Sequence, residues 1–161
     1  VNIMKVKSLM TDAVFCVGSR DSLNDAARLM WEHNCGSAPV VDESNQVVGM
    51  ITDRDIAMAA YINGNTLTEI PVSLAQSRQP VCCSTDDDVK DVQRLMQLEQ
   101  VHRIPVINEE NEPVGIISLN DFAAAYKAGR RGIRAQDIGG TLAAICSPTE
   151  SASEAATVAA A

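Results

Sequence analysis

The sequence predicts an α+β protein made of two pseudo-symmetric halves, each with the order strand, helix, strand, strand, helix. Residues 36–55 return as residues 102–121, and the copies align without a gap over residues 6–59 and 72–125, at an offset of 66 residues. Each copy alternates short β-rich runs with helical patterns. A hydrophobic content of 46% suffices for a buried core, although only 3% of the residues are aromatic. Two copies imply a pseudo-two-fold body with two equivalent clefts.

The first copy is assigned to residues 4–62. Its expected elements, in chain order, are a strand at 14–17, a helix from Ser22 to about Asn34, strands at 38–41 and 47–51, and a helix from Thr52 to Ala60. Ser22 and Thr52 are the expected N-caps because a hydroxyl can accept a hydrogen bond from a free N–H of the first turn. Asp25, three residues after Ser22, completes a capping box.

The second copy is assigned to residues 72–127 and repeats the order. Its expected elements are a strand at 81–83, a helix that begins at Thr85, strands at 104–107 and 114–117, and a helix after Ser118. Asp88 is expected at the box position after Thr85. Residues 63–71 contain Asn-Gly and Pro, which predict a linker. Short lead-in helices are expected near residues 6–10 and 67–74.

Residues 128–146 are predicted to be a C-terminal extension with a helix over Ala135–Cys146. A basic cluster precedes that helix, and a solvated connector is favoured over a docking or phosphate-binding role; its members are Lys127, Arg130, Arg131 and Arg134. Residues 147–161 contain one large apolar residue, Val158. Such a segment buries too little surface to order itself, so we expect it to be disordered and dispensable.

Charge and cysteine usage bound the class of protein. The net charge of −8 argues against binding to nucleic acid or anionic membranes, both of which need clustered cations. The sequence shows neither a membrane-spanning apolar run nor a signal peptide. Five cysteines without framework spacing indicate reduced thiols in a cytoplasmic protein. His33 and His102 are isolated and Cys-x-x-Cys is absent, so no metal site is expected.

Two matching motifs carry a family resemblance. Pro39-Val-Val-Asp is followed by Val-Gly-Met-Ile-Thr-x-x-Asp55, and Pro105-Val-Ile-Asn by Val-Gly-Ile-Ile-Ser-x-x-Asp121. This pattern resembles the cystathionine-β-synthase (CBS) domain, and two copies over residues 4–127 resemble a CBS pair, or Bateman module. The chain is similar to small stand-alone bacterial CBS-domain proteins. The resemblance implies a sandwich-like α/β arrangement, with two three-stranded sheets packed together and helices outside.

The resemblance also implies a ligand and an assembly. Members of the family commonly bind AMP, ADP, ATP or S-adenosylmethionine between the repeats. Asp55 and Asp121 would then accept hydrogen bonds from the ribose hydroxyls. Thr52 and Ser118 begin helices whose free N–H groups favour phosphate. A homodimer of discs is expected, because apolar residues stand amid alanines on the helices 53–60 and 119–126.

Simpler explanations exist for the same residues. Thr52 with Asp55, and Ser118 with Asp121, are also ordinary capping boxes. Arg54 is explained either by solvation or by a phosphate near the helix N-terminus. The pair His102-Arg103 is either an exposed pair before a strand or a phosphate-binding pair.

The family's pattern, carried over, gives two clefts. The first would join Thr52, Arg54 and Asp55 to Cys83, His102 and Arg103. The second would join Ser118, Asn120 and Asp121 to Val17, Ser37 and Ala38. Because only the first offers cations, we expect it to be the main nucleotide site.

Two classes of function remain beside an enzyme. A regulatory module that senses adenosine-containing ligands is favoured, with an adenine nucleotide as ligand and no obligatory cofactor. A ligandless dimerisation or interaction scaffold is the alternative. An enzyme is disfavoured because the sequence shows no nucleophile–base pair, no metal-ligand cluster and no Gly-rich phosphate loop.

Overall fold

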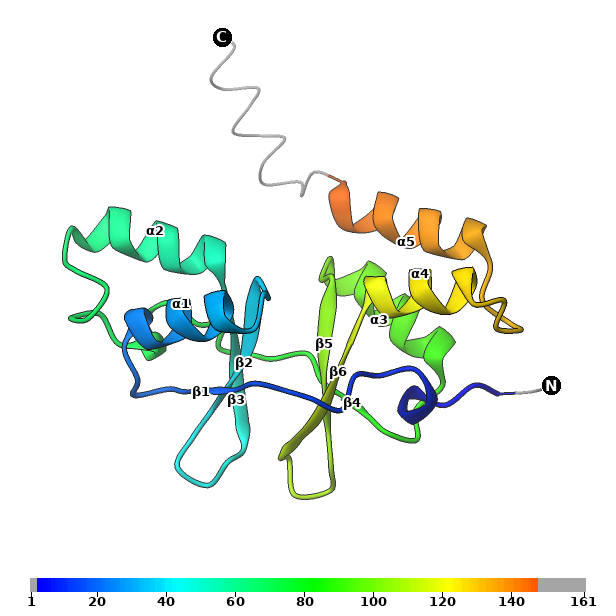
Figure 1. Cartoon of the computed structure of the whole chain (residues 1–161), viewed down its shortest axis with the longest axis horizontal. Helices are drawn as coiled ribbons and strands as arrows, with labels where there is room; N and C mark the ends of the chain where they lie inside the picture. Colours follow the sequence, from blue (N-terminus) through cyan, green and yellow to red (C-terminus); the bar gives the residue numbers. More distant parts are fainter. Residues whose placement is uncertain (1–2, 148–161) are drawn as a thin grey trace, which may run out of the picture.

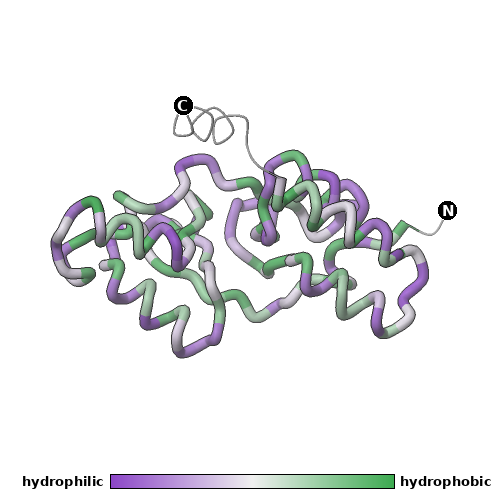
Figure 2. The backbone as a smooth tube through the Cα atoms, turned by 90° about the horizontal axis from the view of Figure 1, so that it is seen from above, coloured by the Kyte–Doolittle hydropathy of each residue, from purple (hydrophilic) through white to green (hydrophobic). Residues whose placement is uncertain are grey.

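The computed structural model of the chain describes residues 3–147. Two three-stranded sheets lie side by side near the centre, and the helices lie toward the outside (Figure 1). The α+β class with two similar halves is therefore confirmed. In both halves, hydrophilic and hydrophobic residues alternate along the helices, as expected for helices with one buried face (Figure 2).

The first half contains a mixed sheet and two helices. Its elements are β1 (Val17–Gly18), α1 (Leu23–Glu32), β2 (Ser37–Val41), β3 (Val47–Thr52) and α2 (Asp53–Asn63). The sheet order is β1-β2-β3; β1 pairs parallel to β2, and β2 pairs antiparallel to β3. In this register Ser37 stands opposite Thr52, which brings the start of β2 to the N-terminus of α2.

The second half repeats this order. Its elements are β4 (Cys83–Ser84), α3 (Val89–Glu99), β5 (Arg103–Ile107), β6 (Pro113–Ser118) and α4 (Leu119–Lys127), followed by α5 (Ala135–Cys146). Its strand order is β4-β5-β6, with Arg103 opposite Ser118. Irregular register at Val40/Val41 recurs at Val106/Ile107, so the correspondence extends to the bulges.

Capping residues fix the helix starts, and one predicted cap is wrong. Complete capping boxes begin α1, α2 and α4, at Ser22, Thr52 and Ser118. The cap of α3 is Asp88, which accepts from the Lys90 N–H, and not Thr85. Ser84 N–H donates to Asp87 at 2.8 Å, so the chain is still in a turn at Thr85.

The first strand of each half is shorter and later than predicted. Val17 pairs with Val40, and Cys83 pairs with Val106, whereas residues 14–16 belong to no strand. The β-propensity of a segment indicates that it suits an extended conformation, but it does not indicate which of its residues pair with a neighbouring strand.

The lead-in of each copy packs on the other copy. The 3₁₀ turn η1 (Val6–Ser8) places Val6 in the core of the second half, where its N–H donates to Asp87 O. The turn η2 (Val72–Leu74) places Val72 in the core of the first half, where its N–H donates to Asp21 O. The start of each sequence copy therefore belongs to the core of the opposite half.

Helix α5 breaks the symmetry. It packs against α3 and α4, and Ile145 joins the core of the second half (Figure 1). Within residues 3–147, α1 and α2 have no such covering helix. The bounds of α5 are those predicted from the sequence. The prediction of a disordered segment at 147–161 lies, except for Ser147, outside the described residues.

Candidate functional site

A hollow lies between the two halves at the start of α2, with a volume of about 230 Å³. We call it the Thr52 hollow, and its lining residues are Ser37, Met50, Thr52, Gln100, Val101, His102 and Arg103. The first three come from β2 and β3, and the others from the α3–β5 loop and the start of β5. The structure thus brings Thr52 together with His102 and Arg103, as the sequence predicts for the first cleft.

Asp55 caps α2 with one carboxylate oxygen. Its Oδ2 accepts from the Thr52 N–H at 2.8 Å and from Thr52 Oγ1 at 2.7 Å. No hydrogen bond to its Oδ1 is formed within residues 3–147. The capping role and a ligand role are therefore compatible for Asp55, because one acceptor oxygen remains.

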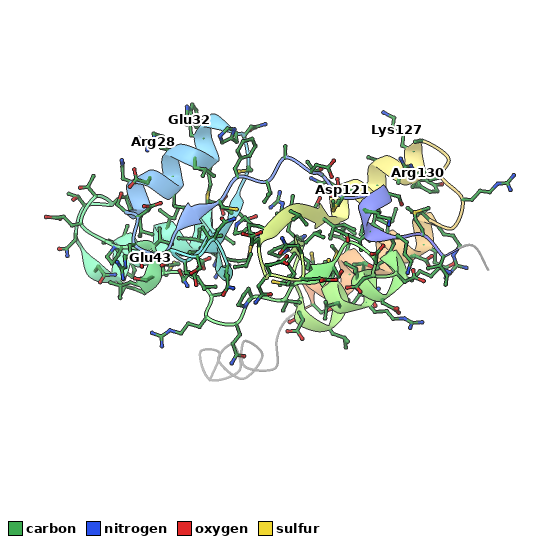
Figure 3. The ribbon with its side chains drawn as sticks, turned by 90° about the horizontal axis from the view of Figure 1, so that it is seen from below. Arg28, Glu32, Glu43, Asp121, Lys127 and Arg130 are labelled. Atoms are coloured by element: carbon green, nitrogen blue, oxygen red, sulfur yellow. The ribbon has the colours of Figure 1, made fainter. Side chains whose placement is uncertain are left out.

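Asp121 differs from Asp55 at the equivalent position. Its Oδ2 accepts from the Ser118 N–H at 2.7 Å and from Ser118 Oγ at 2.8 Å. Its Oδ1 accepts from Thr11 Oγ1 at 3.4 Å. Asp121 lies near the middle of the molecule, close to the segment from the N-terminus (Figure 3). Both of its oxygens have a partner, so Thr11 occupies one acceptor position of Oδ1 that a ribose hydroxyl could otherwise use.

Arg103 reaches across the junction between the halves. Its Nη1 donates to Ser37 Oγ at 3.4 Å. Because Ser37 and Arg103 occupy equivalent positions in the two copies, they face each other across the pseudo-two-fold axis. The sequence predicts Ser37 for the second cleft, whereas the structure places it in the Thr52 hollow beside Arg103.

A second hollow, of about 360 Å³, lies on the other side of the same loop. We call it the Asn120 hollow, and it is lined by His102, Arg103, Leu119, Asn120, Ala123, Ile138 and Leu142. The structure therefore brings Asn120 next to His102 and Arg103 of its own half, and not next to Ser37 and Ala38. Helix α5 supplies Ile138 and Leu142 to this hollow.

Three predicted residues point their side chains into the cores. Val17, Ala38 and Cys83 are all buried in the apolar clusters. Burial, with a smaller effect of Asp87, raises the pKa of the Cys83 thiol to about 12. Only the backbone of these residues is available to a ligand. Arg54 is exposed on the first turn of α2, and neither Arg54 nor Asp55 is among the residues that line the Thr52 hollow.

Sequence reasoning missed Met50, Gln100 and Val101. Met50 belongs to β3, two residues before Thr52, and is half-buried. Gln100 ends α3 in the left-handed conformation, with φ of 52°. Gln100 and Val101 could have been found from their position, because they directly precede His102 and Arg103. They correspond to Asn34 and Cys35 in the first copy.

The basic cluster lies away from the Thr52 hollow. Arg130 donates to Ser8 O, and Arg134 donates to both carboxylate oxygens of Asp137, at 2.8 and 2.7 Å. The hydrogen bond from Arg134 lowers the pKa of Asp137. Lys127 and Arg130 stand toward the far end of α4 from Asp121 (Figure 3). These contacts fit a solvated connector that ties α5 to the N-terminal segment.

The described residues offer neither a metal cluster nor a membrane span. Between residues 3 and 147, no three His, Cys, Asp or Glu side chains gather where an ion could be held. His33 stacks on Phe15, and His102 lines the hollows. None of the helices in this range has the length and apolar character that crossing a bilayer requires.

Comparison with known proteins identifies the family. The profile of the family described as "CBS domain" matches residues 6–61 and 72–128. The chain belongs to the CBS domain family. The two matched segments coincide with the repeat recognised in the sequence, so the predicted CBS pair is confirmed.

Relatives of this CBS pair include small proteins of similar length. CBS domain-containing protein YhcV of Bacillus subtilis is 37% identical over 118 residues, which cover 73% of this chain and 82% of the relative. Hypoxic response protein 1 of Mycobacterium tuberculosis is 32% identical over 151 residues, which cover 91% and 97%.

Solved structures of CBS pairs share the fold. The CBS domain pair of protein MJ0100, in complex with 5′-methylthioadenosine and S-adenosyl-L-methionine, has a TM-score of 0.71 at 26% identity and covers 80% of this chain and 99% of its own. Hypoxic response protein 1 with two coordinated zinc ions has a TM-score of 0.69 at 28% identity and covers 75% of this chain and 98% of its own.

Proposed function

We propose that this CBS pair is a regulatory module that binds an adenosine-containing ligand, such as AMP, ADP, ATP or S-adenosylmethionine, in the Thr52 hollow. The observation that carries the proposal is the meeting of the α2 N-terminus with His102 and Arg103 of the other half. The adenosine ligands of the MJ0100 pair support the ligand class.

The groups around the hollow suit the parts of a nucleotide. Asp55 is not among the lining residues, but it stands on the first turn of α2 next to Thr52, and the oxygen that capping leaves unused can accept from a ribose hydroxyl. The Thr52 end of α2 offers N–H groups and a positive helix dipole. Arg103 would turn from Ser37 toward a phosphate, exchanging a neutral partner for a charged one.

We propose that the Asp121 cleft is weaker, selective for uncharged adenosine groups, or empty. Thr11 donates to the Asp121 carboxylate there. Arg103 lines the Asn120 hollow beside α4 as well as the Thr52 hollow, but its side chain donates to Ser37 on the Thr52 side. A charge-assisted hydrogen bond contributes about 1.5–3 kcal/mol, which corresponds to about tenfold or more in affinity. Arg103 should therefore decide which cleft binds a nucleotide.

The test is calorimetric titration with AMP, ATP, S-adenosylmethionine and 5′-methylthioadenosine. Arg103→Ala should weaken ATP binding by about tenfold or more, and the matched variant Ser37→Ala by much less. Asp55→Asn should reduce affinity more than Asp121→Asn, because Asp55 has the carboxylate oxygen without a partner in the described chain. The two variants are comparable because both replacements keep the shape of the cap. Equal losses from the two Asn variants would contradict the assignment to the Thr52 hollow.

The second candidate function is a ligandless scaffold. It is favoured by exposed apolar side chains on α2, namely Met58, Tyr61 and Ile62. We propose a cytoplasmic homodimer formed through such helix faces, with an unidentified regulated partner and without catalytic activity. Light scattering at micromolar concentration should give the mass of a dimer; a monomer would contradict this assembly. If the protein forms this dimer but binds none of the four adenosine compounds, the scaffold function is favoured over the regulatory module.

A further inference from the structure

The residue that follows α3 connects the Thr52 hollow to α5. Gln100 lines that hollow, and its side-chain Nε2 donates to Ala144 O and to Ser147 O, both at 3.0 Å. Carbonyls at the end of a helix lack partners within the helix. Gln100 therefore caps the C-terminus of α5 with its side chain while it forms part of the wall of the hollow.

The other face of the same loop also rests on α5. His102 and Arg103 line the Thr52 hollow on one side and the Asn120 hollow on the other. Ile138 and Leu142 of α5 line the Asn120 hollow. Residues 100–103 are thus a shared wall between the candidate ligand site and the C-terminal helix.

Docking of α5 combines apolar contacts of Ile138 and Ile145 with buried polar contacts. Gln93 Nε2 and Gln97 Nε2 donate to Thr141 Oγ1 at 3.0 and 2.8 Å, and Thr141 is fully buried. Gly139 and Gly140 stand inside the helix, where glycine is unfavourable. A helix of 12 residues with two interior glycines is not stable by itself in water. Helix α5 is therefore formed only while it is docked.

We propose that Gln100 is a positioning residue for the Thr52 hollow, and that α5 docking and ligand binding stabilise each other through the loop 100–103. The inference rests on the proposed function, because it concerns the same hollow. A ligand that fixes His102 and Arg103 also fixes Gln100, and so strengthens the cap on α5. By thermodynamic linkage, undocking of α5 must then weaken ligand binding by the factor by which the ligand strengthens docking.

The first half provides a matched control. Asn34 occupies the position equivalent to Gln100, also in the left-handed region, with φ of 49°. It lines an open hollow of about 440 Å³ beside Trp31, and no helix of the described chain covers it. Changing Asn34 alters the same kind of helix end without touching α5.

The experiment compares Gln100→Gly with Asn34→Gly, since glycine accepts both backbone conformations without strain. Thr141→Val removes the hydroxyl that anchors α5 at a distance from the Thr52 hollow, and Thr141→Ser retains it. We expect Gln100→Gly and Thr141→Val to weaken ATP binding by about five- to tenfold, at the low end of ordinary coupling. Asn34→Gly and Thr141→Ser should bind like the unmodified chain. ATP should also slow hydrogen exchange of the amides in residues 135–146.

The outcomes separate the two proposals. If the unmodified chain binds ATP but exchange in residues 135–146 does not change, the coupling is overturned and the proposed function stands. If Gln100→Gly and Thr141→Val lower the melting temperature but leave ATP affinity intact, Gln100 is only structural and the inference is wrong. If the unmodified chain binds none of the adenosine compounds, the proposed function fails and the coupling fails with it.

Discussion

The two halves of this CBS pair have the same strands and helices but different surroundings. Helix α5 covers α3 and α4 and is held through Thr141, whereas α1 and α2 leave an open hollow where Trp31 is 88% exposed. Glutamines at positions 93, 97 and 100 of the second copy correspond to Ala27, Trp31 and Asn34 in the first. A repeat therefore duplicates a framework, while substitutions at equivalent positions decide what each copy contacts.

The same lesson holds at the junction. Asp55 keeps a carboxylate oxygen without a partner in the described chain, whereas Thr11 donates to the equivalent oxygen of Asp121. Arg103 and Ser37 are equivalent, yet one carries a cation and the other a hydroxyl. Equivalent positions of one motif thus differ in the acceptors that they leave available and in the side chain, cation or hydroxyl, that they supply.

The largest expected effect concerns the two equivalent core positions Phe122 and Ile56. Phe122 is fully buried in the covered half, and Ile56 borders the open hollow. Phe122→Ala should lower the free energy of unfolding by about 3–5 kcal/mol, and Ile56→Ala by about 2 kcal/mol. Urea unfolding measures both changes. Equal costs would contradict the difference in size and burial between the two side chains.

Two equivalent glycines test how closely the crossing segments pass. A Cβ at Gly49 would lie 2.4 Å from Ser77 O, and one at Gly115 would lie 2.9 Å from Thr11 O. Both Gly→Ala variants should destabilise the protein, by about 1–3 kcal/mol, with the larger loss at Gly49. Gly139→Ala on α5 is the control, because nothing lies within 4 Å of its added Cβ, and it should not destabilise. A harmless Gly49→Ala would contradict the close approach.

The smallest expected effect is a pH dependence at the start of α1. Hydrogen bonds from the Ser22 hydroxyl and backbone lower the pKa of Asp25. A carboxyl with a lowered pKa contributes stability above its unfolded pKa, and that contribution is lost as pH falls through the folded pKa. An NMR titration of Asp25 should show a midpoint below the ordinary value, and Ser22→Ala should raise it. An unchanged midpoint in Ser22→Ala would show that the capping box does not perturb Asp25.

The sequence by itself determined what depends on neighbouring residues. The repeat offset, the caps Ser22, Thr52 and Ser118, and the bounds of α5 follow from spacing and local chemistry. Its one wrong cap, Thr85, arose where consecutive acidic residues offered several candidates and only the turn before α3 selects Asp88. Such signals act within a few residues, so they survive without knowledge of the fold.

Only the tertiary structure decided which segments meet. Val6 and Val72 pack into opposite halves, Ser37 faces Arg103 in the Thr52 hollow and not the Asp121 cleft, and α5 lies over one half. Periodicity reveals that a helix or strand has an apolar face but not which distant segment covers it. That choice depends on the path of the chain and on the summed packing of segments far apart in sequence, and it gives the two copies their different chemistry.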